Sequence, residues 1–322
     1  MELPPAGLTW AEYVDRWVAD CGGWLPLADQ LIHRATGAVD VPLDPQTVER
    51  GLRRLARRHH QAGGQYGRWL VRFFGFTSPI EQRVRWLGNH HSRFADLPSS
   101  IRLELLTLWN RPPVAESPLV AWIHLGIASA HHAQGDRAAA THWLGLADRQ
   151  RHAAGAGTDV EAELLRAQLD LDDGAHGAAR DRHAWIAERL RDAPLSSIHA
   201  ACYLARLHDQ RARLEPDHAA RRAIYAAIPD VDIAYVRYLR SVGLAYCTWK
   251  LGDVAEAARL AQQAVDAAGD GGLVRLRVSG LNMLSRVVPA DEAARVNARA
   301  QRMAEALQDE ELMRRVRQSA PT

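Results

Sequence analysis

The chain has 322 residues, a mass of 35.7 kDa and a formal net charge of +2 at pH 7. This length can bury a large core in one body or two domains, and the near balance of charges excludes a general polyanion binder. Three cysteines without paired spacing indicate no disulfide framework, and neither a signal peptide nor a membrane-spanning apolar run is found, so we expect a cytoplasmic protein without a membrane partner.

The first 113 residues are expected to form a helical domain. Thr9 and Glu12 have capping-box spacing and begin a helix that starts at Trp10. Aromatic and β-branched residues between Tyr66 and Phe76 would also suit a strand, but no second strand is evident to pair with it, so we expect a helix. The other expected helices cover residues 25–36, 45–61, 79–94 and 98–110, and Pro112-Pro113 closes the domain.

Positive charge is concentrated early in the chain. Residues 45–93 contain ten arginines and two glutamates, whereas residues 1–44 contain two arginines and seven acids. Spacings of three and four place several of these arginines along one side of the helix expected at 45–61, where guanidinium groups suit a phosphate backbone. The candidate nucleic-acid contacts are Arg50, Arg53, Arg54, Arg57, Arg58 and Arg68.

Residues 26–61 weakly resemble a helix-turn-helix motif, with TVERGLRRLARR in the recognition position. The connection departs from the motif, because it is about eight residues long where a short turn is usual. The resemblance implies binding to DNA or RNA. The alternative is that these arginines pair with the acidic first 44 residues or with another protein.

A repeated turn organises the rest of the chain. Residues 121–150 are expected to form two antiparallel helices joined at Gly135-Asp136, and similar turns recur at intervals of 39 residues near Gly174, Arg213 and Gly252, with a fifth near Val288. Small residues recur on the second helices. A lone helical hairpin cannot bury its apolar stripe, so the hairpins are expected to stack. The recurring small residues are Ala140, Ala179, Ala219 and Ala257.

The turns Gly135-Asp136 and Gly252-Asp253, each followed by alanines on the second helix, make residues 118–307 resemble the tetratricopeptide repeat (TPR). The 39-residue interval between turns departs from the usual repeat length of about 34 residues. The resemblance implies an all-α chain in which a TPR-like α–α superhelix of about five hairpins fills residues 114–318. It also implies a groove lined by the first helices, which takes a protein or peptide. The groove positions carried over are Trp122, Ser129, His132, Gln168, Tyr203, Gln210, Arg211, Tyr246, Trp249 and Lys250. The alternative is that the aromatic rings among them pack against neighbouring hairpins.

No catalytic arrangement, cofactor motif or metal-ligand spacing is evident. Three features only weakly suggest a ligand site, and a structural role is favoured for each. They are the adjacent histidine pairs as a metal site, the acidic stretch 170–173 as a calcium loop, and the glycine-rich stretch 63–68 as a phosphate loop. We therefore expect a non-enzymatic adaptor or regulator that binds a protein or peptide. The alternatives are a nucleic-acid-binding regulator whose repeats sense a peptide or dimerise, and an enzyme whose groups come from distant parts of the chain.

Overall fold

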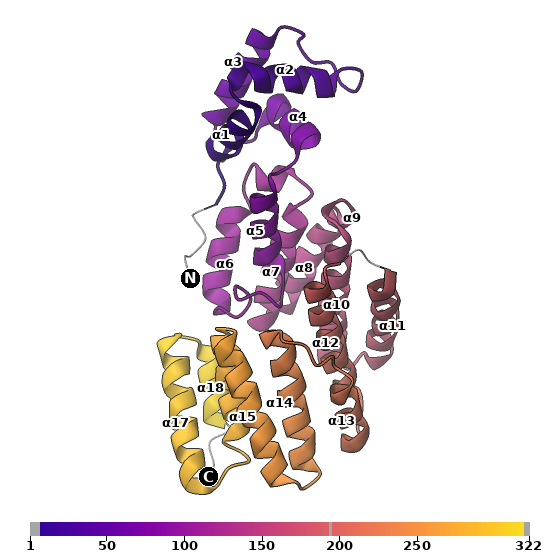
Figure 1. Cartoon of the computed structure of the whole chain (residues 1–322), viewed down its shortest axis with the longest axis vertical. Coiled ribbons are helices and arrows are strands. Elements are labelled where there is room, and N and C mark those ends of the chain that lie inside the picture. The colour runs from indigo at the N-terminus through magenta and orange to yellow at the C-terminus, as the bar shows by residue number, and fades with distance from the viewer. Residues whose placement is uncertain (1–6, 193–194, 319–322) are drawn as a thin grey trace. The chain divides into compact units, whose positions relative to one another are not determined.

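The computed structural model of the chain describes residues 7–192 and 195–318. Within these ranges the secondary structure consists of helices α1 to α18 and one short 3-10 helix, with no strand (Figure 1). The all-α prediction is confirmed, including the helix at the ambiguous aromatic stretch, which is α4 (Gly64–Phe74).

The chain forms two compact units. Among the described residues, the first comprises 7–89, 102–128 and 141–154, and the second comprises 90–101, 129–140, 155–192 and 195–318. This division differs from the boundary expected at Pro113, because the helices on either side of Gly135-Asp136 contribute residues to both units.

In residues 7–154, side-chain caps mark the starts of α1 and α3. Thr9 and Glu12 form the expected capping box at the start of α1, and the Asp44 side chain accepts hydrogen bonds from the first backbone amides of α3. The bounds are α1 Trp10–Cys21, α2 Trp24–Ala35, α3 Pro45–Ala56, α4 Gly64–Phe74, α5 Ser78–Gly88, α6 Ser99–Trp109, the 3-10 helix Val114–Glu116, α7 Val120–Ala133, α8 Arg137–Asp148 and α9 Arg151–Ala154.

Trp10 and Tyr13 of α1 are fully buried in the first unit. The Trp10 indole Nε1 donates to the Gln61 carbonyl at 2.9 Å, and the Tyr13 hydroxyl donates to the Gly75 carbonyl. A Cβ at Gly63 would lie 2.3 Å from the Trp10 ring, so this close contact requires glycine. The core of the unit therefore ties α1 to the segments that precede and follow α4.

The second unit consists largely of helix pairs separated by short turns. Gly174 and Gly252 adopt left-handed φ values of 71° and 94°, as expected for helix ends that need glycine. Helices end and begin on either side of each of the five expected turns, whereas the assignment to a repeat family stays a prediction. The bounds are α10 Ala156–Asp172, α11 His176–Asp192, α12 Ser197–Arg213, α13 His218–Ala226, α14 Ala234–Lys250, α15 Val254–Asp270, α16 Val274–Leu284, α17 Ala290–Ala306 and α18 Glu310–Gln318.

Small residues let the helices of the second unit approach closely. Ala257, Ala261 and Ala264 on α15 are fully buried, and a Cβ at Gly243 on α14 would lie 2.2 Å from the Tyr225 ring. Packing of this kind stabilises helices that have weak amphipathic patterns of their own. None of the helices in the described part of the chain combines the length and the hydropathy needed to cross a bilayer.

Candidate partner-binding surfaces

The six arginines predicted to contact nucleic acid are all exposed in the first unit. Arg53 donates to Glu49 at 2.8 Å and lies 4.5 Å from the centre of the Trp24 ring, and Arg50 donates to Thr47. Within residues 7–192 and 195–318, none of the six forms an ion pair with an acid of the first 44 residues. The alternative of ion pairing with that acidic segment is therefore not seen, although the charge of Arg50 helps, after the hydrogen bond from Thr47, to lower the pKa of Asp44.

The arginine-bearing helix is shorter than predicted. α3 ends at Ala56 rather than near Gln61, so Arg57 and Arg58 lie in the turn that follows it. The chain leaves the helix because His59 adopts a left-handed φ of 51° and its carbonyl accepts a hydrogen bond from the Trp10 amide at 3.0 Å. The guanidinium of Arg58 in turn donates to the Ala62 carbonyl at 2.6 Å. The tertiary contact between Trp10 and His59 overrides the local helix propensity of the arginine run.

Four of the predicted groove residues lie in the interior. Trp122 is 3% exposed in the first unit, and Ser129, Tyr203 and Gln210 are 5%, 1% and 1% exposed in the second. The Gln210 amide donates to the Leu164 carbonyl at 2.9 Å, which anchors α12 to α10. The burial of the Trp122 and Tyr203 rings is what the packing alternative expects, and the polar side chains of Ser129 and Gln210 are buried as well.

Two other predicted groove residues, His132 and Gln168, share one carboxylate. His132 Nε2 lies 2.7 Å from Asp172, and the Gln168 amide donates to the other oxygen of Asp172 at 2.7 Å. Arg213 donates to the Gln168 carbonyl oxygen at 3.0 Å and to Asp209 at 2.9 Å. These side chains form a continuous polar row from α7 across α10 to α12 within the second unit.

Tyr246, Trp249 and Lys250 form what we call the α14 aromatic cluster. The two rings are half-buried, and their centres lie 6.1 Å apart. The Lys250 ammonium lies 4.1 Å from the centre of the Trp249 ring and 5.8 Å from that of Tyr246, which are cation–π distances. Next to the cluster, the large apolar side chains of Leu251, in the turn after α14, and Val254, the first residue of α15, are 51% and 48% exposed.

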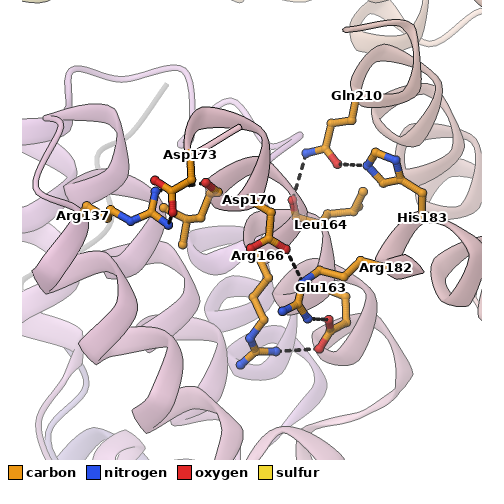
Figure 2. A network of polar contacts seen from close by, with 10 residues as sticks. Arg137, Glu163, Leu164, Arg166, Asp170, Asp173, Arg182, His183 and Gln210 are labelled. Atoms are coloured by element: carbon orange, nitrogen blue, oxygen red, sulfur yellow. Dashed lines mark hydrogen bonds and ion pairs between the residues drawn. The ribbon is translucent and has the colours of Figure 1, made fainter. Parts of the chain in front are cut away.

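Charged side chains between α10 and α11 are paired with one another (Figure 2). Arg182 donates to Glu163 at 2.7 Å and to Asp170 at 2.6 Å, and Arg166 donates to Glu163 at 2.6 Å. Burial lowers the pKa of Arg182, but the hydrogen bonds from its guanidinium to the two carboxylates outweigh burial and raise it. Asp173 pairs with Arg137, so the carboxylates of the acidic stretch face different cations and do not converge on a calcium site.

A pocket of about 250 Å³ lies between the start of α11 and the end of α12. Arg211 was predicted from the sequence as a binding residue, but Arg180 was not, because the predicted groove positions came only from the first helix of each hairpin. The available signal was the spacing of three and four residues that places Arg180, His183 and Ala184 on one face of α11. The lining residues are Arg180, His183, Ala184, Arg211, Leu214 and Glu215.

The histidines of the second unit include one close pair. His91 Nε2 lies 2.7 Å from His199 Nδ1, and burial, followed by the neighbouring His199 and Arg206, lowers the pKa of His91 to about 3. No group of three or more potential metal ligands is found among the residues that the structure describes. Cys21, Cys202 and Cys247 are free thiols.

Comparison with known proteins found no protein-family model that matches the chain, and no significant match among curated proteins or solved structures.

Proposed function

We propose that the chain is a non-enzymatic adaptor whose second unit binds a protein or peptide. Successive helix pairs with a 39-residue turn interval support a TPR-like superhelix, in which first helices offer a ligand-binding face. The observation that carries the proposal is the α14 aromatic cluster, where two half-buried rings, one lysine and adjoining exposed apolar side chains lie together. Half-buried aromatic residues are frequent anchors of protein interfaces.

Selection of peptides on the full-length protein tests this function. Peptides enriched from a random display library are expected to lose most of their affinity when Trp249 and Tyr246 are both changed to Ala, because an anchoring ring typically contributes about 2 kcal/mol or more. Trp185→Ala is the matched control, since Trp185 is 41% exposed on α11 and lies outside the cluster. The measurement is fluorescence anisotropy, with circular dichroism to verify folding.

Two results would contradict the proposal. One is that no peptide is enriched above the background of the library. The other is that the enriched peptides bind the folded double variant and the wild type with equal affinity, which would place their contacts elsewhere on the molecule.

A nucleic-acid-binding regulator is the second candidate, and a specific observation favours it. Arg54, Arg57 and Arg68 are exposed on the first unit and form no ion pair within the described residues. Exposed guanidinium groups without carboxylate partners are available to phosphates. α2 and α3 are joined by residues 36–44, so the helix-turn-helix resemblance keeps its long connection.

Salt dependence distinguishes the two candidates. If the arginines contact a duplex, the slope of log K against log salt is about −0.9 for each phosphate neutralised. Changing four of them to Gln is expected to flatten the slope by several units without loss of helix, since Gln keeps helix propensity. Fluorescence anisotropy of the full chain with labelled DNA and RNA measures this slope. Absence of binding at low salt would exclude the nucleic-acid-binding regulator and leave the adaptor as the remaining candidate. The four substitutions are at Arg53, Arg54, Arg57 and Arg58.

A further inference from the structure

The pocket between α11 and α12 has an unusual balance of charge. Two guanidinium groups, Arg180 and Arg211, and one carboxylate, Glu215, line its volume of about 250 Å³. Glu215 is already engaged, because its Oε1 accepts a hydrogen bond from the Asp217 amide at 3.1 Å. Ala184 and Leu214 supply the apolar part of the lining. With His183 neutral, a ligand of one negative charge would balance the pocket.

His183 is held in its neutral form. It is 2% exposed, and burial lowers its pKa, although the hydrogen bond to Gln210 opposes this shift. The Gln210 amide nitrogen donates to the Leu164 carbonyl, so the Gln210 oxygen faces His183 Nε2, 3.1 Å away, and accepts from it (Figure 2). The imidazole therefore carries its proton on Nε2 and adds no charge, which leaves the two arginines as the cations of the pocket.

These two arginines differ from their neighbours. Arg182, two residues after Arg180 on α11, is paired with Glu163 and Asp170, and Arg206 on α12 is paired with Glu161. By contrast, Arg180 and Arg211 have no ion pair among the described residues. Arg211 is half-buried, and within the part of the chain that the structure describes it donates only to the His183 carbonyl, at 3.0 Å. Burial lowers its pKa. A partly desolvated guanidinium without a carboxylate is stabilised by an incoming anion.

We propose that the α11–α12 pocket binds a carboxylate group of the peptide partner, with Arg211 and Arg180 as its hydrogen-bond donors and Leu214 and Ala184 against the apolar stem. The inference rests on the proposed peptide-binding function for its biological role. The carboxylate is either an acidic side chain or a chain terminus, and both present the same planar acceptor to a guanidinium. A phosphate dianion fits less well, because its second charge would face Glu215 without compensation.

The test uses small probes that need no other surface of the protein. N-acetylglutamic acid α-amide carries a free side-chain carboxylate, and N-acetylleucine carries a free terminal carboxylate. N-acetylglutamine α-amide carries no carboxylate. Ligand-observed NMR titration of the full-length protein is expected to show that at least one acid binds about tenfold more tightly than the glutamine compound, which is the factor for one charge-assisted hydrogen bond. The acid that binds more tightly identifies the source of the carboxylate.

Variants locate the binding. Arg211→Gln and Arg180→Gln are each expected to lower the affinity for the acid probe by about tenfold. Arg191→Gln, the same change at an exposed position of α11 outside the pocket, is expected to leave the affinity for the acid probe unchanged. Arg180 is exposed, so its substitution keeps the fold even if Arg211→Gln does not. Equal binding of acid and amide, or full binding by a folded Arg180→Gln variant, would overturn the proposal.

One further comparison separates this site from the proposed function. Trp249→Ala removes a ring of the α14 aromatic cluster and is expected to leave probe binding unchanged. Loss of peptide binding in that variant with intact probe binding supports both sites. Probe binding without any peptide ligand would refute the adaptor function and retain the carboxylate pocket as a small-anion site.

Discussion

Arg206 on α12 and Glu161 on α10 form a buried ion pair in the second unit, with side chains 7% and 2% exposed. The second carboxylate oxygen of Glu161, Oε2, has no hydrogen-bond partner among the described residues. The pair therefore depends on one contact to neutralise both charges. We predict that Arg206→Met, which keeps the length of the side chain and removes its charge, strongly destabilises this unit.

The size of the effect follows from burial. Both side chains are almost fully buried, so the substitution leaves a carboxylate without a counter-charge in a low-dielectric interior, at a cost of about 3–5 kcal/mol. With a urea m-value of about 2–3 kcal/mol/M for a unit of this size, the unfolding midpoint falls by at least about 1 M. Adding Glu161→Gln removes the stranded charge and is expected to restore at least half of the loss.

Urea unfolding followed by circular dichroism measures these changes. Arg237→Met is the control, because Arg237 pairs with Asp232 at 3.1 Å in an exposed ion pair, with side chains 40% and 96% exposed. Its cost is expected to stay within about 1 kcal/mol. The reasoning is refuted if Arg206→Met is no more destabilising than Arg237→Met, or if the double substitution is worse than Arg206→Met alone.

Two further predictions concern the same unit. Ala257→Glu, and likewise Ala140→Glu, places a charge at a fully buried small residue and should cost about 3 kcal/mol or more, whereas an unchanged urea midpoint would contradict the helix packing. Burial raises the pKa of Asp96 to about 6, against the opposing hydrogen bonds from the Arg275 and Leu276 amides. The folded state thus holds that proton more tightly, so stability falls as pH rises from about 4 to about 6. Urea titrations at several pH values should show Asp96→Asn lacking this fall, and an identical pH profile would refute it.

Much of the helical layout was predictable from local signals. The Thr9–Glu12 capping box and the Asp44 cap mark helix starts, and the recurring turns at Gly135, Gly174 and Gly252 mark helix ends. The end of α3 was not predictable, because the hydrogen bond from Trp10 to the His59 carbonyl joins residues that are distant in sequence. No local pattern in the arginine run indicates that contact.

Side-chain exposure was harder to predict than helix position. Tyr203 and Gln210 were predicted to line the same groove as Tyr246 and Trp249, yet the first two are buried and the last two are half-buried. Register along a helix gives the direction of a side chain but not what packs against it. The pairing of Arg182 with acids and the unpaired state of Arg180, two residues earlier, likewise depend on tertiary neighbours.

The α14 aromatic cluster has a practical consequence for experiments with this protein. Lys250 is the only lysine in the sequence, and its ammonium lies over Trp249. Any amine-directed coupling to a side chain, on a sensor chip or with a dye, would therefore modify this lysine and obstruct the α14 aromatic cluster. The same scarcity makes an amine-reactive crosslinker a site-selective reporter, since any side-chain adduct that a bound partner blocks must lie at this cluster.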